Sequence, residues 1–153
     1  MRNLEKSASL KKKSQKMQIP SDITYVRKTS AEIEEFLRSR KVDESTIFDI
    51  RLCSEEAVKN AIIHGNKKNK EKPVYISYAL EGNKFTLEVE DQGAGFINAK
   101  IPDPTVGENL FRAGGRGVFL IKKLMDKVEY KNRGNKVFMV KFIRREEGGS
   151  NAV

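Results

Sequence analysis

The stretch SEEAVKNAIIHGN, residues 54–66, carries polar side chains at a spacing that could support chemistry. Glu56, Asn60 and His64 follow one another at intervals of four residues. In a helix such residues lie on one face, so a carboxylate, an amide and an imidazole would form a single polar stripe. The same spacing is also typical of a solvated helix face, so the stripe is not diagnostic by itself.

Two glycine-containing segments could bind a flat ligand and a phosphate. In the first, Asp91 ends a predicted strand and is followed by Gly93 and Gly95, which lack a Cβ and let a ligand lie against the backbone. In the second, at residues 113–126, the glycines of AGGRGVFLIKKLMD lead into a predicted helix, whose free N–H groups and dipole favour a phosphate. A dinucleotide-binding turn is a poorer interpretation, because no strand leads into this segment and no βαβ unit surrounds it.

Hydrophobic periodicity predicts the helices and strands that position these segments. Ser21 or Asp22 is the expected cap of the first helix, and Gly65 is the expected stop of the second. Helices come first and strands mostly follow, so we predict an α+β fold. It would be a two-layer sandwich of a mixed, mostly antiparallel sheet covered on one face by about three helices. The predicted helices cover residues 23–37, 43–64 and 116–125, and the predicted strands cover residues 74–80, 84–90, 127–132 and 136–143.

The composition indicates one soluble globular domain. The 153 residues are 38% hydrophobic and 33% charged, which is enough for a hydrophobic core. No apolar run is long enough to span a bilayer and the N-terminus has no secretory signal, so no membrane partner is expected. The single cysteine, Cys53, allows no internal disulfide and favours a cytoplasmic location. We expect Cys53 to be a small, buried apolar residue.

Charge is unevenly distributed along the chain. The net charge is +9, and residues 1–18 hold six basic residues and one acidic residue. We interpret residues 1–18 as a basic, disordered leader, residues 19–143 as one domain and residues 144–153 as a flexible tail. Such a leader can bind polyanions. The rest of the chain has no basic stripe interleaved with aromatic residues, so nucleic acid is not an expected partner.

Together and in this order, the three segments resemble the N-box and the two glycine boxes of the GHKL (Bergerat-fold) ATPases. More narrowly, they look like the anti-sigma-factor serine kinases of bacterial partner-switching systems. The resemblance runs from about Ile19 to Phe142, and IPDPTVGENLFRAGGRGVFLIKKLMD is similar to that subfamily's nucleotide lid and following helix. Sensor histidine kinases share the ATP fold, but this short chain has no phosphoacceptor-histidine hairpin. The resemblance therefore implies that residues 19–143 form an ATP-binding kinase domain.

The resemblance implies that the chain binds ATP with Mg²⁺. Asn60 matches the magnesium-binding asparagine of the family, and an amide oxygen is a suitable hard, neutral ligand for that ion. Glu56 matches the proposed general base, and whether it acts as a base or only orients the acceptor hydroxyl is left open. Glu55 should then point elsewhere. Asp91 matches the aspartate that accepts a hydrogen bond from the exocyclic amine of adenine.

The glycines take backbone roles in the same comparison. Gly93 and Gly95 would let the base lie close to the main chain. Gly115 and Gly117 would place backbone amides around the β- and γ-phosphates. In each of these roles the lack of a side chain lets the ligand approach the glycine backbone.

Some positions are left open or depart from the family pattern. Arg112 and Arg116 could add positive charge near the γ-phosphate, and the sequence does not decide between them. Asn135 stands where the family commonly has a threonine, so the contact to adenine there should be altered or water-mediated. We expect His64 to bond to nearby backbone rather than to a metal, because the chain has no second histidine for a zinc site.

The function implied by the resemblance is an ATP-dependent serine-protein kinase that acts as an anti-sigma or related partner-switching regulator. It would phosphorylate a STAS-domain anti-anti-sigma-like antagonist and, in its other state, hold a sigma factor or another output protein inactive. Similar proteins often form homodimers. An ATP-binding, partner-holding module with little or no kinase activity is the alternative, because it would carry the same motifs. A polyanion-binding protein that uses the basic leader is a third hypothesis.

Overall fold

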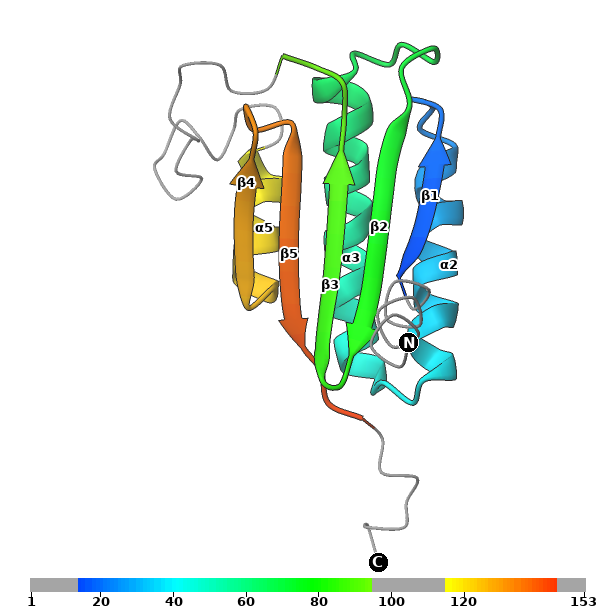
Figure 1. Cartoon of the computed structure of the whole chain (residues 1–153), viewed down its shortest axis with the longest axis vertical. Helices are drawn as coiled ribbons and strands as arrows, with labels where there is room; N and C mark the ends of the chain where they lie inside the picture. The colour runs from blue at the N-terminus through cyan, green and yellow to red at the C-terminus, as the bar shows by residue number, and fades with distance from the viewer. Residues whose placement is uncertain (1–13, 95–114, 146–153) are drawn as a thin grey trace, which may run out of the picture.

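The computed structural model describes residues 14–94 and 115–145 (Figure 1). Residues 95–114, which include most of the expected nucleotide lid, lie outside the described part. The predicted helices and strands are confirmed, with small changes at their ends. The elements are β1 (Gln15–Ile19), α2 (Tyr25–Ser39), α3 (Glu44–Asn60), the π-helical turn η1 (Ala61–Gly65), β2 (Val74–Glu81), β3 (Lys84–Glu90), α5 (Gly115–Leu124), β4 (Lys127–Lys131) and β5 (Lys136–Phe142).

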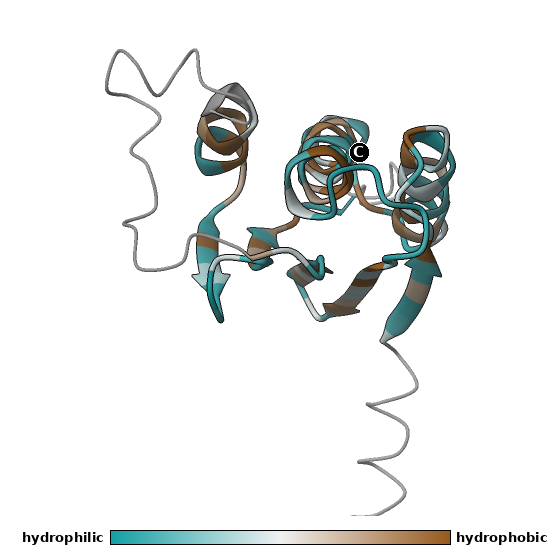
Figure 2. Ribbon diagram, turned by 90° about the horizontal axis from the view of Figure 1, so that it is seen from above, coloured by the Kyte–Doolittle hydropathy of each residue, from teal (hydrophilic) through white to brown (hydrophobic). Residues whose placement is uncertain are grey.

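The five described strands form one sheet in the order β1-β2-β3-β5-β4. Every neighbouring pair is antiparallel, so this sheet contains none of the parallel pairing that a mixed sheet would have. Helices α2, α3 and α5 lie side by side on one face of the sheet (Figures 1 and 2). The predicted two-layer α+β fold is therefore confirmed.

The core lies between the sheet and the helix layer. Alternate strand residues point toward the helices, and the register places Tyr78, Leu87 and Met139 side by side on β2, β3 and β5. All three side chains are buried, as period-two alternation requires for a sheet with one covered face. The helices contribute Ile33 of α2 and Val58 of α3, which are fully buried as well. Burial of each large side chain stabilises the fold by about 1.5–3 kcal/mol.

The structure changes the expected start of the ordered chain. Residues 15–18 belong to β1, although the sequence predicts a disordered leader up to residue 18. Strand β1 pairs with β2, with Met17 opposite Ile76 and Ile19 opposite Val74. The apolar side chains of β1, Met17 and Ile19, alternate with polar ones, which is the pattern of an edge strand with one covered face.

The expected caps of the first helix are also corrected. The residue before α2 is Thr24, whose N–H and hydroxyl both donate to Oδ1 of Asp22, at 3.0 and 2.8 Å. Asp22 therefore organises the turn that leads into the helix and does not cap the helix itself. Ser21 is buried and donates its hydroxyl to the carbonyl of Lys72 at 2.5 Å. Its partner therefore lies in the segment before β2 and not in the first turn of α2.

None of the helices in residues 14–94 and 115–145 is long and apolar enough to cross a membrane.

Candidate nucleotide site

The predicted polar stripe of α3 faces the start of α5. Glu56 and Asn60 are half-buried in the last two turns of α3. A Cβ added to Gly117 would lie 2.7 Å from Oε2 of Glu56 and 3.0 Å from Nδ2 of Asn60. A side chain at position 117 would thus displace both polar groups. The glycine lets the amino end of α5 approach the carboxylate and the amide closely.

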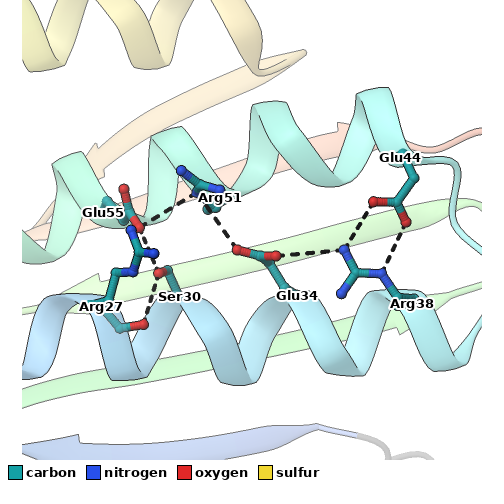
Figure 3. Close-up of polar contacts among 7 residues, drawn as sticks. All are labelled: Arg27, Ser30, Glu34, Arg38, Glu44, Arg51 and Glu55. Carbon is teal, nitrogen blue, oxygen red and sulfur yellow. Dashed lines mark hydrogen bonds and ion pairs between the residues drawn. The ribbon is translucent and has the colours of Figure 1, made fainter.

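Glu55 points away from this cluster, as expected. Its Oε2 accepts a hydrogen bond from Ser30 at 2.7 Å and forms an ion pair with Arg51 at 3.7 Å (Figure 3). Ser30 belongs to α2, whereas Arg51 precedes Glu55 by one turn of α3. Glu56, in contrast, forms an ion pair between its Oε1 and Nζ of Lys59 in its own helix, at 3.1 Å, while its Oε2 faces Gly117 of α5. Adjacent carboxylates therefore face different surroundings, and only Glu56 is next to α5.

Helix α3 continues into the π-helical turn η1 without a break. The N–H of Asn66 donates to the carbonyl of Ala61 at 2.8 Å, which is the wider spacing of a π-turn, and such turns are frequent at functional sites. His64 lies in this turn, where burial and the nearby Lys67 and Lys59 lower the pKa of its imidazole. His64 is therefore a neutral side chain at neutral pH. Within the described ranges, His, Cys, Asp and Glu form no group of three that could hold a metal ion.

Asp91 follows β3 and contacts the end of η1. A Cβ added to Gly65 would clash with the carboxylate of Asp91, and a Cβ added to Gly93 would clash with the carbonyl of Gly65. The N–H of Gly93 donates to Oδ1 of Asp91 at 2.8 Å. Burial raises the pKa of the Asp91 carboxyl, the hydrogen bond from Gly93 opposes this, and Glu90 adds to it. Gly65, expected only as a helix stop, is thus also needed for the position of Asp91.

The structure brings most predicted site residues into two groups. Glu56, Asn60 and Gly117 form the first group, and Asp91 and Gly93 form the second with Gly65. The continuous α3–η1 segment joins the two groups, because Asn60 and Gly65 are separated by five residues, or about 7 Å of helical rise. Of the other predicted residues, Gly115 and Arg116 begin α5, and Gly95 and Arg112 lie outside the described residues.

Asn135 contacts Asp91 directly. Its side-chain Nδ2 donates to the carbonyl of Asp91 at 2.9 Å, and the N–H of Asp91 donates to the carbonyl of Asn135 at 2.9 Å. The residue that replaces the family threonine therefore supports the backbone of Asp91 from the neighbouring strand end.

Asn66 is the polar residue of this region that the sequence did not reveal. It is 1% exposed, and it follows Gly65 directly. Its only sequence signal is its place after the helix stop, where an asparagine is common and carries no particular meaning.

The chemistry of the donor set fits a magnesium ion that arrives with a nucleotide. Mg²⁺ keeps several waters and usually takes one or two protein oxygens together with substrate phosphates. The Asn60 amide next to Glu56 can supply one such oxygen.

A helix amino end packed against a carboxylate–amide pair, with a second acidic group one helical segment away, is the arrangement that the sequence predicts for a nucleotide site. The chain belongs to the family described as histidine kinase-like ATPase domain, which matches residues 19–141. This membership confirms the resemblance to the GHKL ATPases and implies that the domain binds ATP.

Two relatives are similar to this chain over most of its length. It is 29% identical over 143 residues to the serine-protein kinase RsbW of Staphylococcus epidermidis, covering 88% of this chain and 90% of the relative. It is 28% identical over 143 residues to the serine-protein kinase RsbW of Listeria monocytogenes, covering 89% and 91%. The narrower resemblance to anti-sigma-factor serine kinases is therefore confirmed.

Two solved structures share the fold. The RsbU and RsbW domains of Rv1364c from Mycobacterium tuberculosis match with a TM-score of 0.60 and 18% identity, over 86% of this chain and 33% of that chain. The SiaB-SiaC complex from Pseudomonas aeruginosa matches with a TM-score of 0.61 and 11% identity, over 92% and 96%. At these identities the comparison concerns the fold alone.

Proposed function

We propose that this protein is an ATP-dependent serine-protein kinase of a partner-switching system. Its substrate would be a serine on a STAS-domain anti-anti-sigma-like antagonist, and its output partner a sigma factor or another regulated protein. The proposal is supported mainly by the approach of Gly117 to both Glu56 and Asn60, which joins a candidate base to a candidate phosphate site. It is supported further by two relatives that are named serine-protein kinases.

In this proposal the base of ATP binds beside Asp91. The carboxylate accepts a hydrogen bond from the exocyclic amine of adenine, which guanine lacks at that edge. Because Gly65 and Gly93 have no side chains, neither residue covers the Asp91 carboxylate. Burial of Asp91 strengthens such a bond, because a partly desolvated acceptor has less water to compete with the ligand.

The phosphates bind at the start of α5. Gly115 and Gly117 present backbone N–H groups at the positive end of the helix dipole, and Arg112 or Arg116 adds charge. Asn60 would supply an oxygen ligand for Mg²⁺, and the ion would reduce the charge on the phosphate oxygens. These contacts orient the γ-phosphoryl group toward Glu56.

Glu56 receives the proton of the attacking serine hydroxyl in this mechanism. The serine oxygen bonds to the γ-phosphorus, the bond to the bridging oxygen of ADP breaks, and the proton moves to the Glu56 carboxylate. The ion pair with Lys59 leaves Oε2 available, since Lys59 contacts Oε1. The Lys59 side chain is 45% exposed, so this pair holds the carboxylate only weakly.

Phosphorylation would release the antagonist through charge. A phosphoserine adds about −1.5 to −2 charge at neutral pH, which can disrupt an interface. The net charge of +9 would speed the capture of an acidic partner.

A homodimer is part of the same proposal. The sheet face opposite the helices is the candidate surface, because it carries Tyr75 and Phe142, which are 39% and 60% exposed. A groove of about 440 Å³ lies on this face, lined by residues that include Lys16, Tyr75 and Glu88.

The kinase proposal is tested with labelled Mg-ATP and the STAS-domain protein encoded nearest to this one. Wild type should label a serine of that protein, and Glu56→Gln and Asn60→Ala should abolish the label. Glu55→Gln is the matched control, because the neighbouring carboxylate binds Ser30 and Arg51 instead. It should keep the activity.

Other outcomes would contradict the kinase mechanism. If wild type binds ATP and the antagonist but transfers no label, the protein is a partner-holding module. If Glu56→Gln and Glu55→Gln retain equal activity, Glu56 is not the base.

A further inference from the structure

The peptide group between Asp91 and Gln92 is held at both ends by side-chain amides. Its carbonyl, which belongs to Asp91, accepts a hydrogen bond from Nδ2 of Asn135 at 2.9 Å. Its N–H, which belongs to Gln92, donates to Oδ1 of Asn66 at 2.7 Å. We call this pair of residues, Asn66 and Asn135, the amide clamp. The two arms come from the end of η1 and from the start of β5, which lie far apart in the sequence.

The Asn66 arm is itself anchored in the protein. Its Nδ2 lies 2.9 Å from Oγ of Ser21, 3.0 Å from the carbonyl of Lys72 and 3.0 Å from the carbonyl of Pro73. Two of these partners are carbonyls and can only accept, so the orientation of the Asn66 amide is set by its neighbours. With 1% exposure the side chain has no competing water.

Only an amide satisfies this position. A carboxylate would face the two carbonyls without a donor, and an aliphatic side chain would leave the N–H of Gln92 unpaired. The Asn66 side chain thus links the segment before α2, the segment before β2 and the turn after β3.

Fixing the 91–92 peptide also limits where the Asp91 carboxylate can lie. The carboxylate contacts Gly65, the residue that precedes Asn66, and accepts the N–H of Gly93 at 2.8 Å. The main chain of Asp91 is bound to Asn135 a second time, through its own N–H at 2.9 Å. Rotation of the 91–92 peptide would break both arms of the clamp and move the carboxylate away from Gly65.

We propose that the amide clamp sets the position of Asp91 and thereby the preference of the site for a purine that carries a 6-amino group. Asn66 and Asn135 are positioning residues in this inference, since they act through Asp91 and need not touch the ligand. The inference rests on the proposed binding of adenine by Asp91. The experiment that tests the inference therefore measures nucleotide selectivity and not stability alone.

The test compares the affinities of Mg-ATP and of the Mg complex of purine riboside triphosphate, which lacks the 6-amino group, by calorimetry. Wild type should prefer ATP about tenfold, the value of one hydrogen bond to a charged acceptor. Asn66→Ala and Asn135→Leu should bring the ratio of the two dissociation constants toward one. Asp91→Asn should do the same. Hydrogen exchange of the Gln92 amide in the free protein should become faster in Asn66→Ala.

Thr29→Ala is the control for a merely structural role. It removes a buried hydrogen bond to the carbonyl of Tyr25 within α2, outside the clamp, and should lower the melting temperature while leaving the affinity ratio unchanged. If Asn66→Ala does not fold, Asn135→Leu decides, because Asn135 is only half-buried. A folded Asn135→Leu variant with the wild-type ratio would overturn the inference.

Failure of the underlying function gives different results. Wild type that binds neither nucleotide would overturn both proposals. Wild type that binds both equally would remove the adenine contact of Asp91 and the inference with it, while ATP binding at the phosphate end would stand.

Discussion

At the scale of single residues, the candidate site depends on glycines, which have no side chain, as much as on polar residues. Gly117 makes room for Glu56 and Asn60, and Gly65 makes room for Asp91. Neither glycine has a positive φ, so glycine is required at these positions because a neighbouring group lies too close for a side chain and not because of the backbone conformation. Substitutions at these positions should therefore weaken ligand binding, because they displace the polar side chains of the site.

Gly65→Ala should weaken ATP binding and lower the free energy of unfolding by about 1–3 kcal/mol, as expected for overpacking. The added methyl group would clash with the Asp91 carboxylate and displace it. Calorimetry with Mg-ATP and urea denaturation measure the two effects. Gly82→Asn is the control, because Gly82 has a φ of +60° in an open turn and asparagine tolerates that conformation. ATP affinity of the wild-type level in Gly65→Ala would contradict the close contact.

Asp91→Asn should lose ATP affinity by about tenfold to a hundredfold while gaining stability at neutral pH. Burial raises the pKa of the Asp91 carboxyl, so the folded state binds a proton more tightly than the unfolded state. The wild type therefore loses stability relative to the variant as pH rises from the ordinary pKa of 3.8 through the raised one. Below the ordinary pKa the difference should vanish. Urea denaturation across this pH range measures it, and a variant less stable than wild type at neutral pH would reverse the sign.

At the scale of elements, helices α2 and α3 are joined by a chain of charges as well as by apolar packing. Arg51 of α3 lies 3.6 Å from Glu34 and 3.7 Å from Glu55, and Arg38 joins Glu34 to Glu44 (Figure 3). At the outer end of this chain Arg38 and Glu44 are 52% and 61% exposed, whereas Arg51 is 33% exposed. The central arginine should therefore contribute more than the outer one.

Arg51→Met should lower the free energy of unfolding by up to about 1 kcal/mol, and Arg38→Met by less. Arg51 has two acidic partners in a partly buried place, whereas salt and water screen the exposed Arg38. Urea denaturation at low and high salt should show a larger loss for Arg51→Met at low salt. Kinase activity should be unchanged, because this chain of charges excludes Glu56. Equal losses for both variants would contradict the assigned order.

At the scale of the whole molecule, one face of the sheet is covered by helices and the other is not covered by any described helix (Figure 2). If the uncovered face is the dimer interface, Phe142→Ser should shift the protein toward monomers in analytical ultracentrifugation. Phe48→Ser is the matched control, since Phe48 is 53% exposed but lies on α3. A shift caused by Phe48→Ser and not by Phe142→Ser would place the interface on the helix layer instead.

Cys53 reports on the stability of the whole fold. It is fully buried in the middle of α3, and burial raises the pKa of its thiol to about 12. A thiol reagent should therefore react only after global unfolding. Mg-ATP at a hundred times its dissociation constant should stabilise the fold by about 2.7 kcal/mol and slow the labelling about a hundredfold. Denatured protein provides the reference rate, and rapid labelling of the native protein would show that α3 opens locally.

Local patterns predicted most of the fold because they follow from backbone geometry. The alternation in VYISYAL and KFTLEVE specifies a hairpin with one apolar face, and the structure pairs Leu80 with Phe85 on that face. The four-residue spacing of Glu56 and Asn60 puts them on one side of α3, which follows from helical periodicity alone. The expected cap of the first helix and the leader boundary were wrong, since Ser21 and β1 are bound by residues more than fifty positions away, whereas the expected stop at Gly65 is confirmed.

By itself, the sequence determined the α+β class, the helices and hairpins, the family and the different directions in which Glu55 and Glu56 point. Only the tertiary structure decided that Gly65 lies against Asp91, that Asn66 and Asn135 hold the same peptide group, and that residues 15–18 join the sheet. Helical and strand periods are properties of neighbouring residues, so a sequence displays them directly. Contacts between Asn66 and Gln92 span 26 positions and exist only after the sheet and the helix layer have packed, which leaves no local pattern to recognise.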